Sequence, residues 1–224
     1  MKLLRLLIQI KKTILKKRRP DLDDLSNKLD KFLDFDNGFF IEAGANDGYT
    51  QSNTYFLEKE KDWNGLLVEG MPELYNKCVK ERPNSIVKNF ALVSDDYDEE
   101  NVTMHYADLM SVVNGSLKSK LAQEQHIERG LNLQYLDHSY SVDVPAKTLE
   151  AVLDTIPDLP SIDFLSLDVE GYELNVLKGL NLSKYRPKYI LVEARFFKEV
   201  DELLSENDYK LIKKMSKHDY LYQN

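Results

Sequence analysis

The sequence predicts one α/β domain built on a mostly parallel, seven-stranded sheet, with helices on both faces and an antiparallel hairpin at its C-terminal end. Two apolar runs support this fold class, because each reads as a buried parallel strand that ends in a turn containing glycine and carboxylates. The first run, 39–43, enters the turn 44–48, and the second, 162–167, enters the turn 168–171. In open α/β sheets, such turns line a ligand crevice at the carboxyl ends of the strands.

The other elements follow in alternating order along the chain. Runs of apolar and β-branched residues predict the parallel strands 38–43, 64–69, 85–91, 162–168 and 188–193. Helical spacing predicts the helices 52–60, 72–82, 173–179 and 197–206. The stretch 101–106 predicts an added strand or edge, and alternation within 209–222 predicts the terminal hairpin. A polar stretch, 107–140, is predicted to be irregular except for a helical piece near 117–129.

Residues 1–30 form a separate N-terminal segment, and residues 31–224 form the predicted domain. The first 20 residues contain eight lysines or arginines and no acid, and their apolar residues fall on one helical stripe. A basic amphipathic helix of this kind can bind an anionic membrane surface through residues 1–19, or it can pack on the domain or on a second subunit. No apolar run in it is long enough to span a bilayer.

The rest of the chain is acidic, with 22 basic and 38 acidic residues after position 20. Because nucleic-acid binding requires a basic surface, this balance argues against nucleic acid as a partner. Cys78 is the single cysteine and has no partner for an internal disulfide, which favours a reducing compartment. We therefore expect a cytoplasmic protein, at most peripheral to a membrane surface.

The turn after the first strand combines backbone freedom with polar side chains. Gly44 and Gly48 can adopt a positive φ and have no Cβ, so a ligand can approach the backbone closely. Glu42 at the strand end can bind a cationic amine, and Asn46 and Asp47 can hold polar ligand atoms or cap the following helix. The G-x-x-x-G spacing differs from the G-x-G-x-x-G of dinucleotide sites. A plain strand-to-helix turn is the alternative interpretation.

Carboxylates also follow the second and fourth parallel strands. Glu69 ends the second strand about 20 to 25 residues past the glycine turn, where nucleotide-binding α/β folds place an acid on the ribose hydroxyls. After the fourth strand, Asp168 or Glu170 can orient a cofactor while the other accepts a proton from the substrate. With Glu193 they can instead bind a divalent cation, Mg²⁺ or Mn²⁺, or they can simply cap the next helix. His105, on the strand before the long polar stretch, is a further candidate base near the crevice.

These motifs together resemble the FkbM family of S-adenosylmethionine-dependent O-methyltransferases, and the resemblance extends over about residues 36–222. The matching segments are 40–54, 65–69, 144–149, 165–173, 178–179 and 189–193. The resemblance implies a Rossmann-like class I methyltransferase fold with S-adenosylmethionine as the cofactor. The residues that it implies as cofactor contacts are Glu42, Gly44, Ala45, Asn46, Asp47, Gly48, Ser52, Asn53, Glu69, Asn89, Ala91 and Asp168.

The predicted function is methyl transfer from S-adenosylmethionine to a hydroxyl of a sugar or glycan. The sugar preference rests on the range of acceptors in the family and on residues 107–140, whose polar and aromatic side chains predict an acceptor-binding insert. A solvent-exposed connection is the alternative for that stretch. Two other functions stay open. A nicotinamide-dependent oxidoreductase would also use Glu69 on a ribose, although the G-x-G-x-x-G motif is missing, and a non-catalytic binding module could share the fold.

Overall fold

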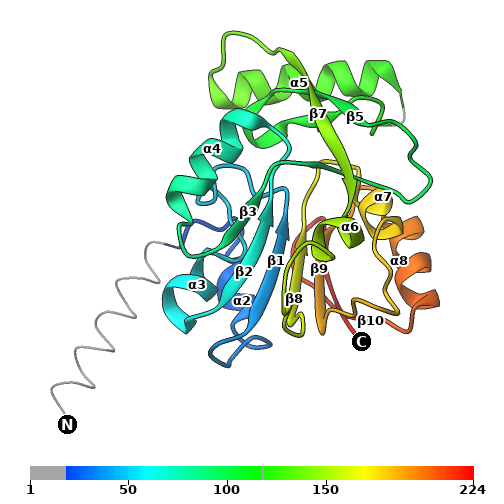
Figure 1. Ribbon diagram of the computed structural model, residues 1–224. Helices are drawn as coiled ribbons and strands as arrows, with labels where there is room; N and C mark the ends of the chain where they lie inside the picture. The colour runs from blue at the N-terminus through cyan, green and yellow to red at the C-terminus, as the bar shows by residue number, and fades with distance from the viewer. Residues whose placement is uncertain (1–18, 118) are drawn as a thin grey trace, which may run out of the picture.

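The computed structural model describes residues 19–117 and 119–224, and its centre is a seven-stranded sheet with the strand order β10-β11-β9-β8-β1-β2-β3 (Figure 1). The strands are β1 (Phe39–Ala43), β2 (Asn64–Val68), β3 (Ile86–Lys88), β8 (Phe164–Leu167), β9 (Tyr189–Glu193), β10 (Lys210–Lys214) and β11 (Asp219–Gln223). The neighbours from β9 to β3 pair in parallel, whereas β11 pairs antiparallel with both β9 and β10. The mostly parallel sheet and its terminal antiparallel hairpin are therefore confirmed.

The strand order places a switch point at β1. The chain builds β2 and β3 on one side of β1 and then crosses to β8 and β9 on the other side. The carboxyl ends of β1 and β8 consequently lie side by side, with Ala43 paired to Leu167. Ligands of open α/β sheets bind in the crevice that opens at such a point.

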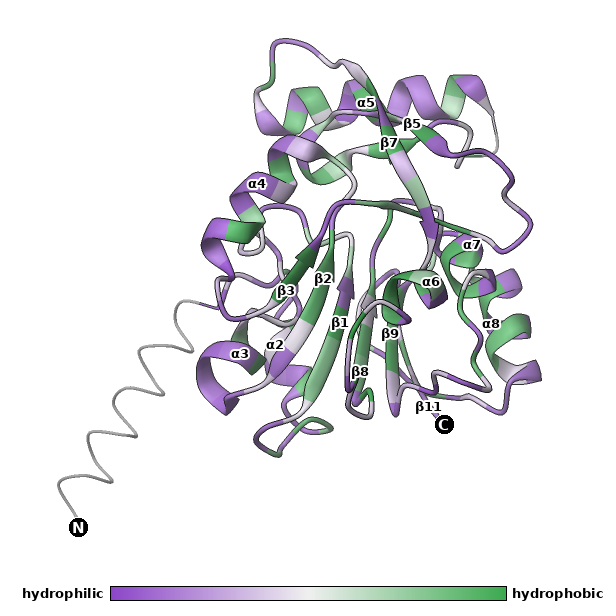
Figure 2. Cartoon of the chain, in the orientation of Figure 1, coloured by the Kyte–Doolittle hydropathy of each residue, from purple (hydrophilic) through white to green (hydrophobic). Residues whose placement is uncertain are grey.

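Apolar side chains alternate along the strands and divide the core into two layers, so that Phe40 packs on one face of the sheet and Ile41 on the other. The helices on the Ile41 face are α6 (Leu149–Leu153), α7 (Glu173–Lys178) and α8 (Phe197–Glu206). The helices on the Phe40 face are α2 (Leu25–Leu29), α3 (Tyr55–Lys61) and α4 (Pro72–Glu81). Figure 2 shows the hydrophobic strands between helices that carry hydrophilic residues. The predicted helices on both faces are therefore confirmed.

A second, four-stranded sheet and helix α5 (Lys120–Gln134) lie beyond the carboxyl ends of the parallel strands (Figure 1). Its strands, in the order β4-β7-β5-β6, are β4 (Ala91–Val93), β7 (Ser141–Thr148), β5 (Asn101–His105) and β6 (Val112–Val113). The prediction of one strand over 85–91 is wrong, because the chain divides there into β3 and β4. The side-chain amide of Asn89 donates to the carbonyl oxygens of Glu69 (2.8 Å) and Gly70 (2.7 Å), which ends the β2–β3 ladder.

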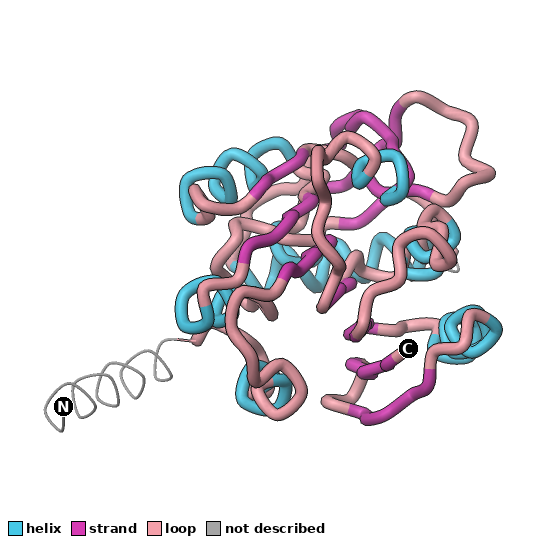
Figure 3. The backbone as a smooth tube through the Cα atoms, turned by 60° about the horizontal axis from the view of Figure 1, so that its bottom comes forward, coloured by secondary structure: helices cyan, strands magenta, loops and turns pink. Residues whose placement is uncertain are grey.

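Residues 107–140 are more regular than the sequence predicts. They contain the 3₁₀ helix η1 (Asp108–Met110), β6 and α5, and they lead directly into β7. Only Val144 of the eight residues in β7 is fully buried, so this strand has a weak apolar pattern. In the turned view of Figure 3, helices lie around the periphery and the strands of both sheets lie between them.

The predicted amphipathic helix falls almost entirely in residues 1–18, which lie outside the described part of the chain. Arg19 fastens the start of the described chain to the domain. Its guanidinium binds Glu60 (2.5 Å) and Asp30 (3.2 Å) and lies 4.4 Å from the centre of the Phe56 ring. Within residues 19–117 and 119–224, no helix combines the length and apolar character needed to cross a membrane.

Candidate active site

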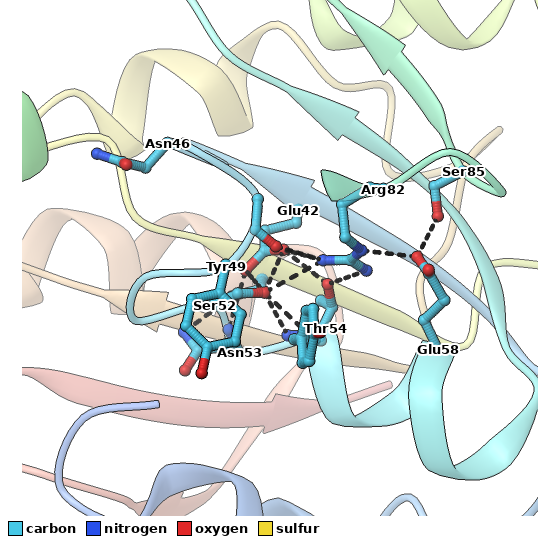
Figure 4. Close-up of polar contacts among 12 residues, drawn as sticks. Glu42, Asn46, Tyr49, Ser52, Asn53, Thr54, Glu58, Arg82 and Ser85 are labelled. Atoms are coloured by element: carbon cyan, nitrogen blue, oxygen red, sulfur yellow. Dashed lines mark hydrogen bonds and ion pairs between the residues drawn. The ribbon is translucent and has the colours of Figure 1, made fainter. Parts of the chain in front are cut away.

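A buried polar network supports the glycine turn after β1. The carboxylate of Glu42 accepts hydrogen bonds from Ser52 Oγ (2.9 Å), the backbone N–H of Asn53 (2.9 Å) and Thr54 Oγ1 (2.6 Å). Its cationic partner is the guanidinium of Arg82, which lies 3.6 Å away. Figure 4 shows these side chains converging, whereas Asn46 projects away from them. The positive charge that the sequence predicts beside Glu42 therefore comes from the chain itself, and not from a ligand amine.

Arg82, at the end of α4, connects three parts of the fold. Its side chain is 0% exposed, and it forms a second ion pair with Glu58 of α3 at 2.6 Å. The guanidinium also donates to the carbonyl oxygen of Gly48 at 3.1 Å and to Thr54 Oγ1 at 3.2 Å. One side chain thus ties β1, α3 and the glycine turn together, and a buried arginine is tolerated because its N–H groups have partners.

The glycines of the turn are required by packing within the chain. Gly44 has a φ of +84°, and a Cβ on it would lie 1.8 Å from the carbonyl oxygen of Asp168. Gly48 has a φ of +81°, and its Cβ would lie 2.9 Å from both Arg82 Cγ and Cys78 Sγ. These contacts belong to the fold, so the close approach that the sequence predicts at the glycines is first an approach of one backbone segment to another.

Replacing Gly44 by alanine should therefore destabilise the protein as well as weaken ligand binding. Because β1 and β8 would have to separate, we expect the free energy of unfolding to fall by about 2–3 kcal/mol. Gly115→Ala is the matched control, since Gly115 also has a φ of +81° but, apart from its chain neighbours, none of the described residues places an atom within 4 Å of its Cβ position. Urea denaturation of both variants measures the difference. An equal fall in the free energy of unfolding of both variants would show that glycine is needed at position 44 for its positive φ, and not for the close contact with Asp168.

A cavity opens at the carboxyl ends of β1, β2 and β8, at the switch point of the sheet. The predicted cofactor residues that line it are Gly44, Asn46, Glu69, Ala91 and Asp168. Apolar residues of its wall include Val68, Leu74, Phe90, Leu92, Met104 and Val113. The other predicted cofactor residues lie behind this lining, in the network, the glycine turn or the β3–β4 connection: Glu42, Ala45, Asp47, Gly48, Ser52, Asn53 and Asn89.

Glu69 presents a buried carboxylate to the cavity. One of its oxygens accepts the backbone N–H of Asn46 at 2.7 Å, and the other accepts that of Met71 at 2.8 Å. Burial raises the pKa of Glu69 to about 7, although these N–H donors oppose the shift. Each carboxylate oxygen has a second lone pair, so Glu69 can still accept hydrogen bonds from ligand hydroxyls.

Three carboxylates gather where β8 and β9 end. Oxygens of Asp168, Glu170 and Glu193 all lie within 4.8 Å of one another. Asp168 keeps part of its side chain open to solvent, but the surrounding protein and the charges of Glu193 and Glu170 raise its pKa well above the usual value. Because like charges this close repel, the three carboxylates disfavour being ionised together.

Glu170 is held from two sides. The guanidinium of Arg195 hydrogen-bonds to its carboxylate, and Nε2 of His126 lies 3.6 Å from the same oxygen. Burial raises the pKa of Glu170 to about 7, although Arg195 opposes the shift. Burial and the charge of Arg195 lower the pKa of His126 to about 4, so its imidazole is neutral at pH 7. Asp168 and Glu170 both line the cavity, but the carboxylate of Glu170 is engaged by Arg195 of the chain itself.

His105 is not placed in the cavity. Its neighbour Met104 lines the cavity, and because side chains alternate along a strand, His105 points to the other face of the second sheet. Its ring nitrogens contact Asn114 Oδ1 (3.3 Å) and Ser141 Oγ (2.9 Å). The expectation of a base at His105 beside the crevice is therefore wrong. The histidine that reaches the acids is His126 of α5, which lies 3.6 Å from Glu170. Sequence spacing carries no signal for it, because α5 meets the turn after β8 only in the folded protein.

The groups around the cavity fit a nucleoside ligand that also carries positive charge. Glu69 offers acceptors for ribose hydroxyls, and the apolar wall around Phe90 and Leu92 suits a purine ring. Asp168 and its acidic neighbours favour a cation at the β8 side of the cavity. The cavity thus combines an apolar wall with carboxylates on its β2 and β8 sides, which is the combination that the sequence predicts for a nucleoside cofactor.

The chain matches the family model of the methyltransferase FkbM domain over residues 42–222. Among solved structures, it is similar to a methyltransferase FkbM from Methylobacillus flagellatus KT, with 15% identity, 84% of this chain and 44% of that chain covered, and a TM-score of 0.47. It is also similar to a SAM-dependent methyltransferase from Aquifex aeolicus, with 14% identity, 93% and 95% coverage and a TM-score of 0.43. The chain thus spans less than half the length of the Methylobacillus protein.

A comparison with curated proteins finds no match. The match to the FkbM domain, by contrast, begins at Glu42 in β1 and ends in β11, so it contains every residue named above as lining the cavity and the three acids Asp168, Glu170 and Glu193. The chain therefore belongs to the methyltransferase FkbM family.

Proposed function

We propose that this protein is an S-adenosylmethionine-dependent O-methyltransferase that acts on a hydroxyl of a sugar or glycan. Family membership supports methyl transfer. The observation that supports the cofactor site is the cavity at the switch point, which has Glu69 on the β2 side and Asp168 on the β8 side. The hydroxyl acceptor is supported by Asp168, a carboxylate suited to take up a proton.

The residues around the cavity divide the binding of the cofactor between them. Glu69 accepts the ribose hydroxyls, the wall around Phe90 and Leu92 encloses the adenine, and the acids near Asp168 balance the positive charges of the methionine end. When bound, S-adenosylmethionine supplies an electrophilic methyl group. The buried network of Glu42 and Arg82 holds the backbone turn that carries Gly44 and Asn46 in place.

Asp168 is the proposed base. Its raised pKa brings its proton affinity closer to neutral pH than that of an ordinary aspartate, which suits proton transfer at pH 7. With S-adenosylmethionine bound as the methyl donor, the Asp168 carboxylate would take up the proton that the acceptor hydroxyl loses on methylation. The negative charge of Glu193 beside Asp168 favours uptake of this proton, while Arg195 holds Glu170 in place next to them.

Calorimetry with S-adenosylhomocysteine and with NAD tests the class of cofactor. We expect S-adenosylhomocysteine to bind and NAD not to bind, because the chain lacks the glycine pattern that a pyrophosphate needs. Tighter binding of NAD would favour the nicotinamide-dependent oxidoreductase. Binding of neither ligand would favour a non-catalytic module. A screen of sugars and glycans for methyl transfer from labelled S-adenosylmethionine then identifies the acceptor.

The affinity for S-adenosylhomocysteine should depend on pH through Glu69. The pKa of Glu69 is raised to about 7, and ribose hydroxyls donate best to its ionised form. Affinity should therefore rise by up to about tenfold per pH unit between pH 5.5 and 7 and level off above pH 8. Because Asp168 also titrates, the test is the difference between the wild type and Glu69→Ala in calorimetry at each pH. A difference that stays constant from pH 5.5 to 8.5 would show that Glu69 does not bind the ligand in its ionised form.

A divalent cation at Asp168, Glu170 and Glu193 is a second proposal for the acidic cluster. The spacing of the three carboxylates supports it, whereas the bond between Arg195 and Glu170 already balances one of the charges. Titration with Mn²⁺, followed by electron paramagnetic resonance, decides whether the three carboxylates bind a cation. Mn²⁺ binding that is lost in Glu193→Gln supports the cation site, and Mn²⁺ that stays free throughout the titration rules the site out.

Contact with a membrane through residues 1–19 likewise stays a proposal.

A further inference from the structure

A second, polar groove adjoins the cofactor cavity. Val113 of β6 and Tyr172, the residue before α7, line both spaces, so the groove begins where the cavity ends. The other side of the groove is formed by the connection between β4 and β5 and by the exposed face of the second sheet. A molecule lying in this groove would reach the mouth of the cavity at Tyr172, only a few residues along the chain from Asp168.

The lining of the groove is acidic and rich in hydrogen-bonding groups. Three of its residues, Glu99, Glu100 and Asp143, carry carboxylates, and none of the described residues that line it is a lysine or an arginine. Its uncharged polar and aromatic members are Tyr97, Asn101, Thr103, Asn114 and Tyr172. Three more acids, Asp95, Asp96 and Asp98, lie in the same connection. Such a lining attracts cations and repels phosphate groups.

We propose that this groove binds the methyl acceptor, and that the acceptor is a sugar that carries a protonated amine. The inference rests on the proposed function and names the class of its substrate. Carboxylates bind an ammonium group through charge-assisted hydrogen bonds, and tyrosine rings add a cation–π contribution. Asparagine and threonine side chains can bind the ring hydroxyls. A nucleotide-activated or phosphorylated sugar would place its negative charges against Glu99 and Glu100, so the groove selects against these acceptors.

Three tetrasaccharides that differ mainly in charge test this inference. The protein, saturated with S-adenosylhomocysteine at pH 6 and low salt, is titrated in a calorimeter with the tetramers of glucosamine, of N-acetylglucosamine and of galacturonic acid. We expect the cationic tetramer to bind about tenfold more tightly than the neutral one, since several exposed charge pairs each contribute a few-fold. The anionic tetramer should not bind, and added salt should weaken the binding of the cationic tetramer.

A charge-neutralised variant locates the binding in the groove. Glu99→Gln with Glu100→Gln should weaken the binding of the glucosamine tetramer by about fivefold and leave that of the N-acetylglucosamine tetramer unchanged. Glu202→Gln with Glu206→Gln, two exposed acids of α8, is the control for the loss of the same charge elsewhere, and it should bind as the wild type does. Equal affinity for the cationic and neutral tetramers, no binding of either, or equal weakening in both double variants would overturn the inference. Such results would not contradict the proposed function. That function is contradicted only if S-adenosylhomocysteine itself does not bind.

Discussion

Replacing Arg82 by methionine should lower the free energy of unfolding by about 3–5 kcal/mol, the cost of removing one partner of a buried ion pair. The variant keeps much of the side-chain volume but leaves the carboxylates of Glu42 and Glu58 without their buried cation. It also removes the donor to the carbonyl oxygen of Gly48, so the glycine turn loses an anchor. Urea denaturation followed by circular dichroism measures the loss.

Lys77→Met on the same helix is the matched control for Arg82→Met. Lys77 is exposed and forms an ion pair with Glu73 one turn away, so its loss should change the free energy of unfolding by less than about 0.5 kcal/mol. A second test combines Arg82→Met with Glu42→Gln. The double variant should lose less than the sum of the two single variants, because the lone carboxylate is no longer charged. Similar losses for Arg82→Met and Lys77→Met would contradict the role given to the network.

Replacing Asp168 by asparagine should reduce the rate of methyl transfer by about 10² or more, the usual scale of general base catalysis. The variant keeps the shape of the side chain and removes its charge. Its free energy of unfolding should stay the same or rise at pH 8, because the charges of Glu193 and Glu170 disfavour an ionised Asp168. A loss of rate without a loss of stability therefore separates a catalytic role from a structural one.

The affinity for the cofactor distinguishes the two chemical roles of Asp168. If Asp168 takes the acceptor's proton, the affinity of Asp168→Asn for S-adenosylhomocysteine should change only a few-fold while the rate falls. If it mainly binds the methionine end, both should fall together. Asp158→Asn, an exposed acid in a turn, is the control for the loss of charge. An Asp168→Asn enzyme that works at the full rate would remove both roles.

Much of the fold was predictable because local pattern and tertiary environment agree. The helix predicted over 197–206 matches α8, and the runs at 38–43 and 64–69 match β1 and β2 to within a residue. The second sheet was harder to predict. Its strand β7 is mostly exposed, and the chain leaves the main sheet at Asn89, whose side chain bonds to the backbone of Glu69. The periodicity of apolar residues indicates neither feature.

The candidate site shows the same division. Glu69 and Asp168 could be found because each is an acid directly after a buried parallel strand, and strand ends converge in this fold class. The ion pair of Glu42 could not be predicted. Its cation, Arg82, lies 40 positions later in the chain and meets Glu42 only after α3 and α4 have packed. The partners of Glu170, which are Arg195 and His126, likewise come from distant elements. Sequence reasoning thus located the edge of the sheet that carries the site, but not the charge pairing within it.

Binding of S-adenosylhomocysteine to the wild type and to Glu69→Ala tests most directly the claim that the cavity at the switch point is the cofactor site. Calorimetry at pH 8 should show one molecule bound per chain, with binding to Glu69→Ala weaker by about 1.5–3 kcal/mol, the range for hydrogen bonds to a charged group. Glu202→Gln should bind as the wild type does, and the circular dichroism spectrum should show that Glu69→Ala is folded. A folded Glu69→Ala protein that binds S-adenosylhomocysteine as tightly as the wild type would contradict the account, because the ribose would then lie away from the end of β2.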